Sequence, residues 1–130
     1  MGKYGKAAEL AVEVLAKSKS IAPRTAWNSA VARVFPDSRS SQIKGCPRDS
    51  FLGLCGMGVI QGVPPGQYTR SVKNKSYVSR ALAALRSNPA LSENEDRLWS
   101  IATNGAKTVP NHQIEVLVAL WRKGRIRSEL

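Results

Sequence analysis

The feature that most constrains the fold of this chain is a series of short apolar repeats at helical spacing, separated by prolines and glycines. In the first repeat Tyr4, Ala7, Ala8, Ala11 and Leu15 recur at steps of three and four residues, with charged residues opposite. Five further segments repeat the pattern. The sequence therefore predicts helices over about 3–18, 23–35, 47 to an end among Gly53, Gly56 and Gly58, 75–87, 92–104 and 112–123.

One segment departs from this spacing. Residues 59–63 are short, apolar and rich in branched side chains, which is typical of a strand. Pro64-Pro65-Gly66 follows and favours a type II turn, so Tyr68-Thr69 could pair back as a second arm. We therefore predict an all-α or nearly all-α fold, a compact bundle of five to six helices with possibly one small β-hairpin near 59–69. No linker or long repeat appears, so residues 1–130 are read as a single helical domain.

Capping residues set the expected helix boundaries. Asn74 is a plausible cap for the helix over 75–87, and Ser92 with Glu95 matches a capping box. The polar stretch at 37–41 is expected to be a loop. The last helix is apolar almost all round, so it lies either at the centre of the core or in a dimer interface.

Positive charge is concentrated in the middle of the chain. The formal net charge is +11, of which residues 17–86 hold +10. Such a local excess points to an anionic partner more than an evenly basic surface does. We therefore predict a small basic, non-enzymatic protein that binds nucleic acid through residues 39–86. The expected phosphate contacts come from Arg39, Lys44, Arg48, Arg70, Lys73, Lys75 and Arg80.

Two forms of this interface fit the sequence. One is a winged helix-turn-helix, in which Pro64-Pro65-Gly66 forms the tip of the wing. The other is a less specific surface on which Tyr68 and Tyr77 alternate with basic residues and stack on single strands, although Tyr77 also fits the core face of its helix. The main alternative of a different class is a protein-interaction module or homodimer built on the last helix, whose positive charge serves only solubility.

An enzyme is the third possibility and the least favoured. Cys46 lies at a predicted helix N-terminus between Lys44 and Arg48, which would lower the pKa of its thiol. His112 is the one histidine, and Asp49 or Glu115 could orient it. Two cysteines and a distant histidine do not make a metal site, and no nucleotide fingerprint appears. We therefore predict no enzymatic activity and no cofactor.

The expected compartment is the cytoplasm. Cys46 and Cys55 are too few for a disulfide framework, and on one helix they would lie about 13.5 Å apart in rise, too far for a bridge. No apolar run approaches the roughly 18 to 20 residues that a membrane span needs. Glu9 and Glu13 interrupt any secretory signal. No membrane partner is expected.

Several short motifs together resemble those of a family of small, about 130-residue bacterial proteins of unknown function. They are Lys44-Gly45-Cys46-Pro47-Arg48, Phe51-Leu52-Gly53-Leu54-Cys55, Tyr68-Thr69, Asn74-Lys75, Leu98-Trp99 and Asn111-His112-Gln113. The resemblance spans nearly the whole chain. It implies a bacterial cytoplasmic protein but no activity, ligand or site residue.

Overall fold

Helices make up the regular structure of the computed structural model, which describes residues 2–128. The elements are α1 (Lys3–Lys17), α2 (Pro23–Val34), α3 (Arg39–Gln42), α4 (Gly45–Gly56), α5 (Val72–Ser87), the 3-10 helix η1 (Pro89–Glu93), α6 (Glu95–Ala102) and α7 (Gln113–Arg122). Six of the α-helices have eight residues or more, and α3 is a single turn. The predicted all-α class is confirmed. None of the helices described is both long and apolar enough to cross a membrane.

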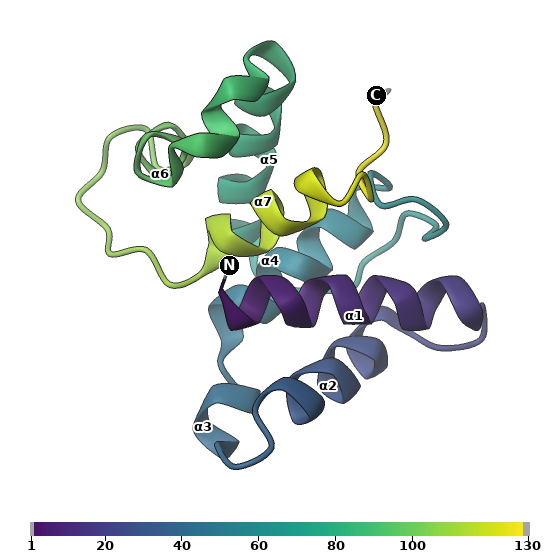
Figure 1. Cartoon of the computed structure of the whole chain (residues 1–130). Coiled ribbons are helices and arrows are strands. Elements are labelled where there is room, and N and C mark those ends of the chain that lie inside the picture. The colour runs from purple at the N-terminus through teal and green to yellow at the C-terminus, as the bar shows by residue number, and fades with distance from the viewer. Residues whose placement is uncertain (1, 129–130) are drawn as a thin grey trace.

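Helix α7 lies at the centre of the arrangement (Figure 1). It packs on α1, α4, α5 and α6, while α1 also packs along α2. Its buried apolar residues are Ile114, Val116, Leu117, Val118, Ala119 and Leu120. All of them except Ala119 join one cluster with the buried faces of the other helices. The sequence allowed this helix to lie either at the centre of the core or in a dimer interface. The structure places it in the core of its own chain.

The contact between α1 and α7 depends on Gly5. A Cβ atom at this position would lie 2.9 Å from the Cβ of Ala119, so any larger side chain would push the two helices apart. The same turn is fastened by a polar contact, since the Gly5 backbone N–H donates to Glu115 Oε2 at 2.8 Å. Glu115 thus accepts from a backbone group that has no partner within α1. Close approach and capping together set the angle at which α1 crosses α7.

Three predicted boundaries were wrong because hydroxyl and amide side chains cap elsewhere. Ser71, not Asn74, caps α5: its Oγ accepts from the Asn74 backbone N–H at 3.3 Å. Asn94 caps α6 by accepting from the Arg97 N–H, so the Ser92–Glu95 capping box does not form. The expected loop at 37–41 contains the start of α3, whose cap Ser38 accepts from Ser41 N–H. In each case the residue used is a strong N-cap former.

The predicted β-hairpin near 59–69 is wrong, and with it the winged helix-turn-helix. No strand occurs within residues 2–128, and Ile60 instead forms one antiparallel bridge with Ile126 near the end of the chain. Gln61 N–H donates to Arg125 O at 3.0 Å, and Arg127 N–H donates to Val59 O at 2.7 Å. The two prolines at 64–65 have no N–H to donate to a second arm. The Tyr68 hydroxyl donates to Pro64 O at 2.8 Å, which curls this part of the loop upon itself.

Two glycines fasten this loop to the end of α4. Gly66 N–H donates to Gly56 O at 3.1 Å. A Cβ atom on Gly56 would lie 2.6 Å from Gly66 O, so this contact requires glycine at position 56. The loop then runs directly from Gly66 to Ser71, where α5 begins. The Gly56–Gly66 contact therefore positions residues 67–71.

This contact predicts an unusual response to a glycine-to-alanine change. Alanine normally favours a helix by about 1 kcal/mol relative to glycine. At Gly56 we expect the opposite, a loss of about 1–3 kcal/mol in the free energy of unfolding, because the new methyl group meets backbone that cannot move freely. Urea denaturation of Gly56→Ala measures the effect.

Gly45→Ala is the matched control in the same helix. Its nearest new neighbour is the far end of the Arg48 side chain, at 3.4 Å, which can rotate away. We expect its free energy of unfolding to change by less than about 1 kcal/mol. A Gly56→Ala protein as stable as the Gly45→Ala protein would contradict the proposed close contact.

Candidate nucleic-acid interface

Residues of the segment 67–71 line two adjoining grooves. The first, here called the α5 groove, has a volume of about 420 Å³ and is lined by Gln67, Thr69, Arg70 and Ser71 of this segment and by Val72, Lys75, Ser76, Ser79 and Arg80. The second, the α2–α4 groove, has a volume of about 600 Å³ and adds Arg24, Arg48 and Asp49 to the same segment. Arg70 lines both grooves. Three helices and one loop therefore contribute to the two adjoining grooves, which together are here called the hollow.

Four of the seven cations predicted from the sequence line this hollow: Arg48, Arg70, Lys75 and Arg80. The other three line neither groove. Arg39 lies on α3, Lys44 is the N-cap residue of α4, and Lys73 is in the first turn of α5; all three are exposed. The structure thus brings together a subset of the predicted residues and leaves the rest on other parts of the surface.

Arg24 was missed by the sequence analysis. It lies in the first turn of α2, outside the 39–86 segment to which the interface was assigned, and is exposed on the wall of the α2–α4 groove. Its place in the hollow depends on how α2 packs against α4. The only signal available in the sequence was its membership of the wider basic segment, residues 17–86.

The start of α5 orders the polar groups of the hollow. Thr69 Oγ1 accepts from the Ser71 backbone N–H at 3.1 Å, and Ser71 Oγ accepts from Asn74 Nδ2 at 3.0 Å. From this start, residues three and four apart share a face of the helix. Lys75, Ser76, Ser79 and Arg80 therefore line one groove. The result is a row of hydroxyl groups between basic side chains.

Neighbouring groups hold three of the cations. Arg80 Nε donates to Ala102 O at 2.7 Å, and its guanidinium carbon lies 6.0 Å from the ring centre of Tyr77. The backbone of Lys75 packs against Gly53, where an added Cβ would lie 3.1 Å from Lys75 Cα. Arg48 forms an ion pair with Asp49 at 3.2 Å. The contacts of Arg80 and Arg48 position their guanidinium groups, and the Gly53 contact positions the backbone from which Lys75 extends.

The lining remains strongly positive after this ion pair is counted. Five cations, Arg24, Arg48, Arg70, Lys75 and Arg80, stand against the single acid Asp49. A concave surface lined by one sign of charge focuses its field and concentrates counter-ions. Guanidinium, ammonium and hydroxyl groups are the usual protein partners of phosphate oxygens. The hollow is therefore chemically suited to a phosphate-bearing ligand.

The model of a family of unknown function (DUF6979) matches residues 1–127. The chain belongs to this family. No curated protein and no solved structure matches the chain. The resemblance to a family of unknown function is thus confirmed, and membership of DUF6979 adds no ligand or activity. Bacterial origin and cytoplasmic location stay predictions.

The aromatic residues of this DUF6979 member divide between surface and core. Tyr77 is buried and meets Trp99 edge to face, with ring centres 5.1 Å apart. It therefore packs in the core, as its helical position also allowed. Tyr68 is half-buried and lines the α2–α4 groove. Of the two tyrosines considered for stacking, only Tyr68 reaches the hollow.

The residues of the enzyme hypothesis make contacts of three different kinds. His112 Nδ1 lies 2.9 Å from Glu115 Oε1, and its ring lies 4.6 Å from that of Tyr4. These contacts tie His112 to the first turn of α1. Cys46 lies in the first turn of α4, and Asp49 pairs with Arg48. Of the proposed acids, Glu115 is therefore the one that contacts the histidine.

The two cysteines are free, as predicted, and they differ in burial. Burial raises the pKa of Cys55 to about 12, so its thiol stays protonated near neutral pH. Cys46 is half-buried. We expect iodoacetamide at about pH 8 to alkylate Cys46 in the folded protein and to leave Cys55 intact, as peptide mass spectrometry can measure.

Urea provides the control, because both cysteines should react once the chain unfolds. Modification of Cys55 in the native protein at a rate close to that of Cys46 would contradict its burial. Selective reaction at Cys46 follows from exposure alone and is no sign of catalysis.

Proposed function

We propose that this protein binds nucleic acid without chemical turnover, and that the strand's phosphates lie in the α5 and α2–α4 grooves. The observation that carries the proposal is the convergence of five cations on the hollow around residues 67–71. They come from α2, α4, the loop before α5, and α5 itself. No cofactor is part of the proposal.

The division of the cations between two adjoining grooves suits a polyanion better than a single small anion. Arg70 lies where the grooves meet, with Arg24 and Arg48 in one direction and Lys75 and Arg80 in the other. A ligand that carries phosphates at regular intervals can contact both sets at once, and each contact releases counter-ions from the strand. The affinity is therefore expected to fall steeply with salt.

A charge-matched pair of variants tests this proposal. Arg24→Gln combined with Arg70→Gln removes two exposed groove cations. We expect this double variant to bind at least about tenfold more weakly at low salt, because charge-assisted contacts are lost. Its slope of log affinity against log salt should fall by about 0.7 per lost contact on a single strand, or about 0.9 on a duplex.

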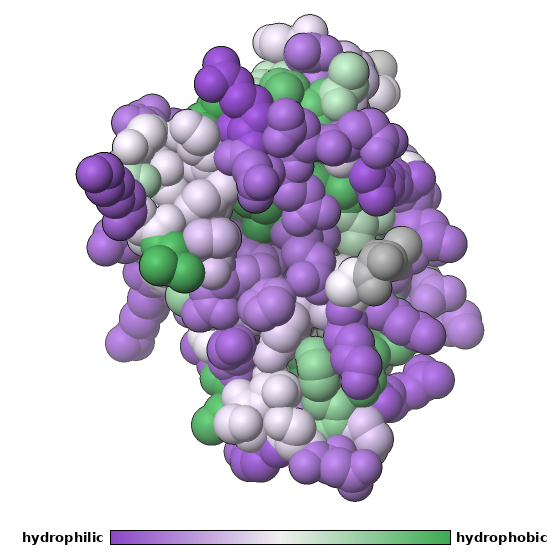
Figure 2. Space-filling model, turned by 60° about the vertical axis from the view of Figure 1, so that its left-hand side comes forward, coloured by the Kyte–Doolittle hydropathy of each residue, from purple (hydrophilic) through white to green (hydrophobic). Residues whose placement is uncertain are grey.

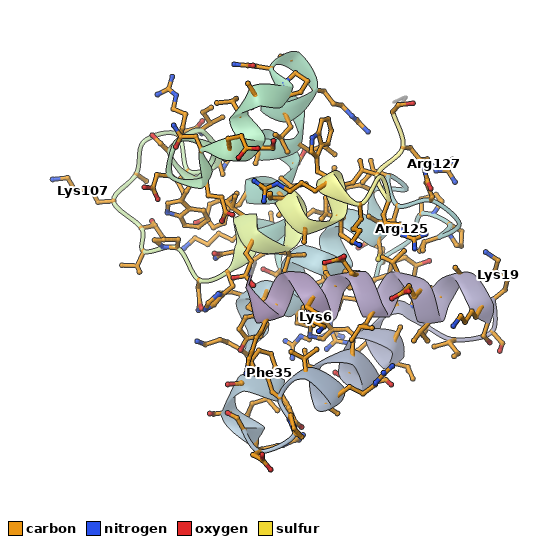
Figure 3. All side chains as sticks on the ribbon, viewed as in Figure 1. Lys6, Lys19, Phe35, Lys107, Arg125 and Arg127 are labelled. Carbon is orange, nitrogen blue, oxygen red and sulfur yellow. The ribbon has the colours of Figure 1, made fainter. Side chains whose placement is uncertain are left out.

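The control combines Lys6→Gln with Lys107→Gln, which gives the same net charge. Both lysines are exposed, and Lys107 projects from the loop between α6 and α7 (Figure 3). Fluorescence anisotropy between about 50 and 200 mM salt compares the two proteins. An equal loss in both would show that only net charge matters, and an absence of binding by the unmodified protein would end the proposal.

The alternative, an interaction module built on the last helix, has lost its main support. The apolar residues of α7 are buried within the chain, and only Trp121 among its large apolar side chains is half-buried. On the face seen in Figure 2 hydrophilic residues predominate, and the apolar ones form small separate patches. Association through the buried face of α7 would require its core contacts to open. We therefore develop only the nucleic-acid proposal.

A further inference from the structure

A third hollow, here called the apolar pocket, adjoins the α2–α4 groove. It has a volume of about 420 Å³ and lies between the turn that joins α1 to α2 and the loop around residue 63. Its apolar walls come from Leu15, Ile21, Pro23, Val63, Pro64 and Tyr68. Tyr68 lines both this pocket and the groove, and Arg24 of the groove directly follows Pro23 of the pocket. An apolar site and a cluster of arginines therefore share one wall.

The walls of the apolar pocket are fixed by contacts within the protein. Lys19 Nζ donates to Gly62 O at 3.3 Å, which joins the α1–α2 turn to the loop opposite. Figure 3 shows Lys19 just beyond the end of α1, in that turn. Tyr68 is held by its bond to Pro64 O, and its ring packs against Gly66, where an added Cβ would lie 3.1 Å from ring carbon Cζ. The pocket is thus formed before a ligand binds.

The neighbourhood restricts what kind of ligand fits. Apolar walls favour an apolar group, and Arg24, Arg48 and Arg70 in the adjoining groove favour an anion. A nucleotide unit offers both, since its base has apolar faces and its phosphate is an anion. Bases stack on aromatic rings regardless of their sequence, and Tyr68 offers such a ring at the boundary.

We infer that the apolar pocket receives an unpaired base of a single strand, while the adjacent phosphates lie on Arg24, Arg48 and Arg70. This inference rests on the proposed function and adds a choice between single and double strands to it. In a duplex each base is stacked and paired, so a duplex can use the grooves but not the pocket. Selectivity for single strands then comes from Tyr68 and its apolar neighbours, and the cations supply affinity that is common to both.

The test compares two strands that carry the same charge. One is a fluorescein-labelled pyrimidine strand of about 16 nucleotides, and the other has the same length and phosphates but abasic sugars throughout. We expect the unmodified protein to bind the strand with bases about tenfold more tightly. The matching duplex has the higher charge density, so it should bind with the steeper salt dependence but without the contribution from unpaired bases.

Two variants assign this difference to the pocket. Tyr68→Leu should abolish most of the tenfold preference, which is measured within each protein as the ratio of its affinities for the strands with and without bases. Both strands meet the same grooves, so this ratio isolates the contribution of the bases. Tyr68→Phe, which keeps the ring and its packing against Gly66 and loses the bond to Pro64 O, should keep most of the preference. Val109→Asn is the control, since this exposed apolar residue lies on the loop before α7, which lines none of the three hollows.

The outcomes separate this inference from the proposed function. Equal affinity for strands with and without bases would overturn the inference and leave the proposed function standing. Failure to bind either strand would remove both. Vesicles that contain an anionic phospholipid are the competing probe, because a lipid also joins an apolar group to a phosphate. Displacement of a bound strand by such vesicles, lost in Tyr68→Leu, would assign the pocket to lipid and overturn the inference.

Discussion

The burial of α7 is the interaction on which the rest of the structure depends. An apolar helix surrounded by its own chain needs partners on every side, and α1, α4, α5 and α6 supply them. At Gly5 the backbone of α1 approaches so closely that only hydrogen fits, and Glu115 of α7 accepts the N–H of that residue. Interiors packed at this density transmit small displacements to their neighbours. The positions of α4 and α5, and hence of both grooves, follow from how they pack against α7.

The surface built on this core gathers like charges, which opposes folding. Five cations around residues 67–71 repel one another, and the structure offsets part of that repulsion locally. Asp49 pairs with Arg48, and the Ala102 carbonyl accepts from Arg80. Arg24 and Arg70 remain exposed, where water screens them. A bound polyanion would relieve the remaining repulsion, so binding and stability should be linked in this protein.

The sequence predicted the buried faces of the helices well because helical periodicity is a local property. The inner face expected for α5, which includes Tyr77, Val78 and Leu82, is buried as predicted. The segment at 59–63 was misassigned because its partner Ile126 lies near the other end of the chain, and local composition cannot reveal such a pairing. Caps were misplaced where two candidate hydroxyl or amide residues lay within a few positions of each other. Ser71 rather than Asn74 is such a case, since Asn74 turns inward and accepts from Gln113.

The candidate site was only partly predictable, because residues that are close in a charged segment need not lie on the same face of the folded protein. Seven cations within residues 39–86 were predicted to contact phosphates. The fold directs four of them into the hollow, while Arg24 enters from an earlier helix. What selects these residues is the path of residues 57–71, which the Gly56–Gly66 contact and the curled Tyr68 side chain determine. The same path gives the hollow an apolar neighbour, since Tyr68 faces both. Charge along the sequence therefore predicts a class of ligand, while the shape of one loop decides which side chains line the hollow.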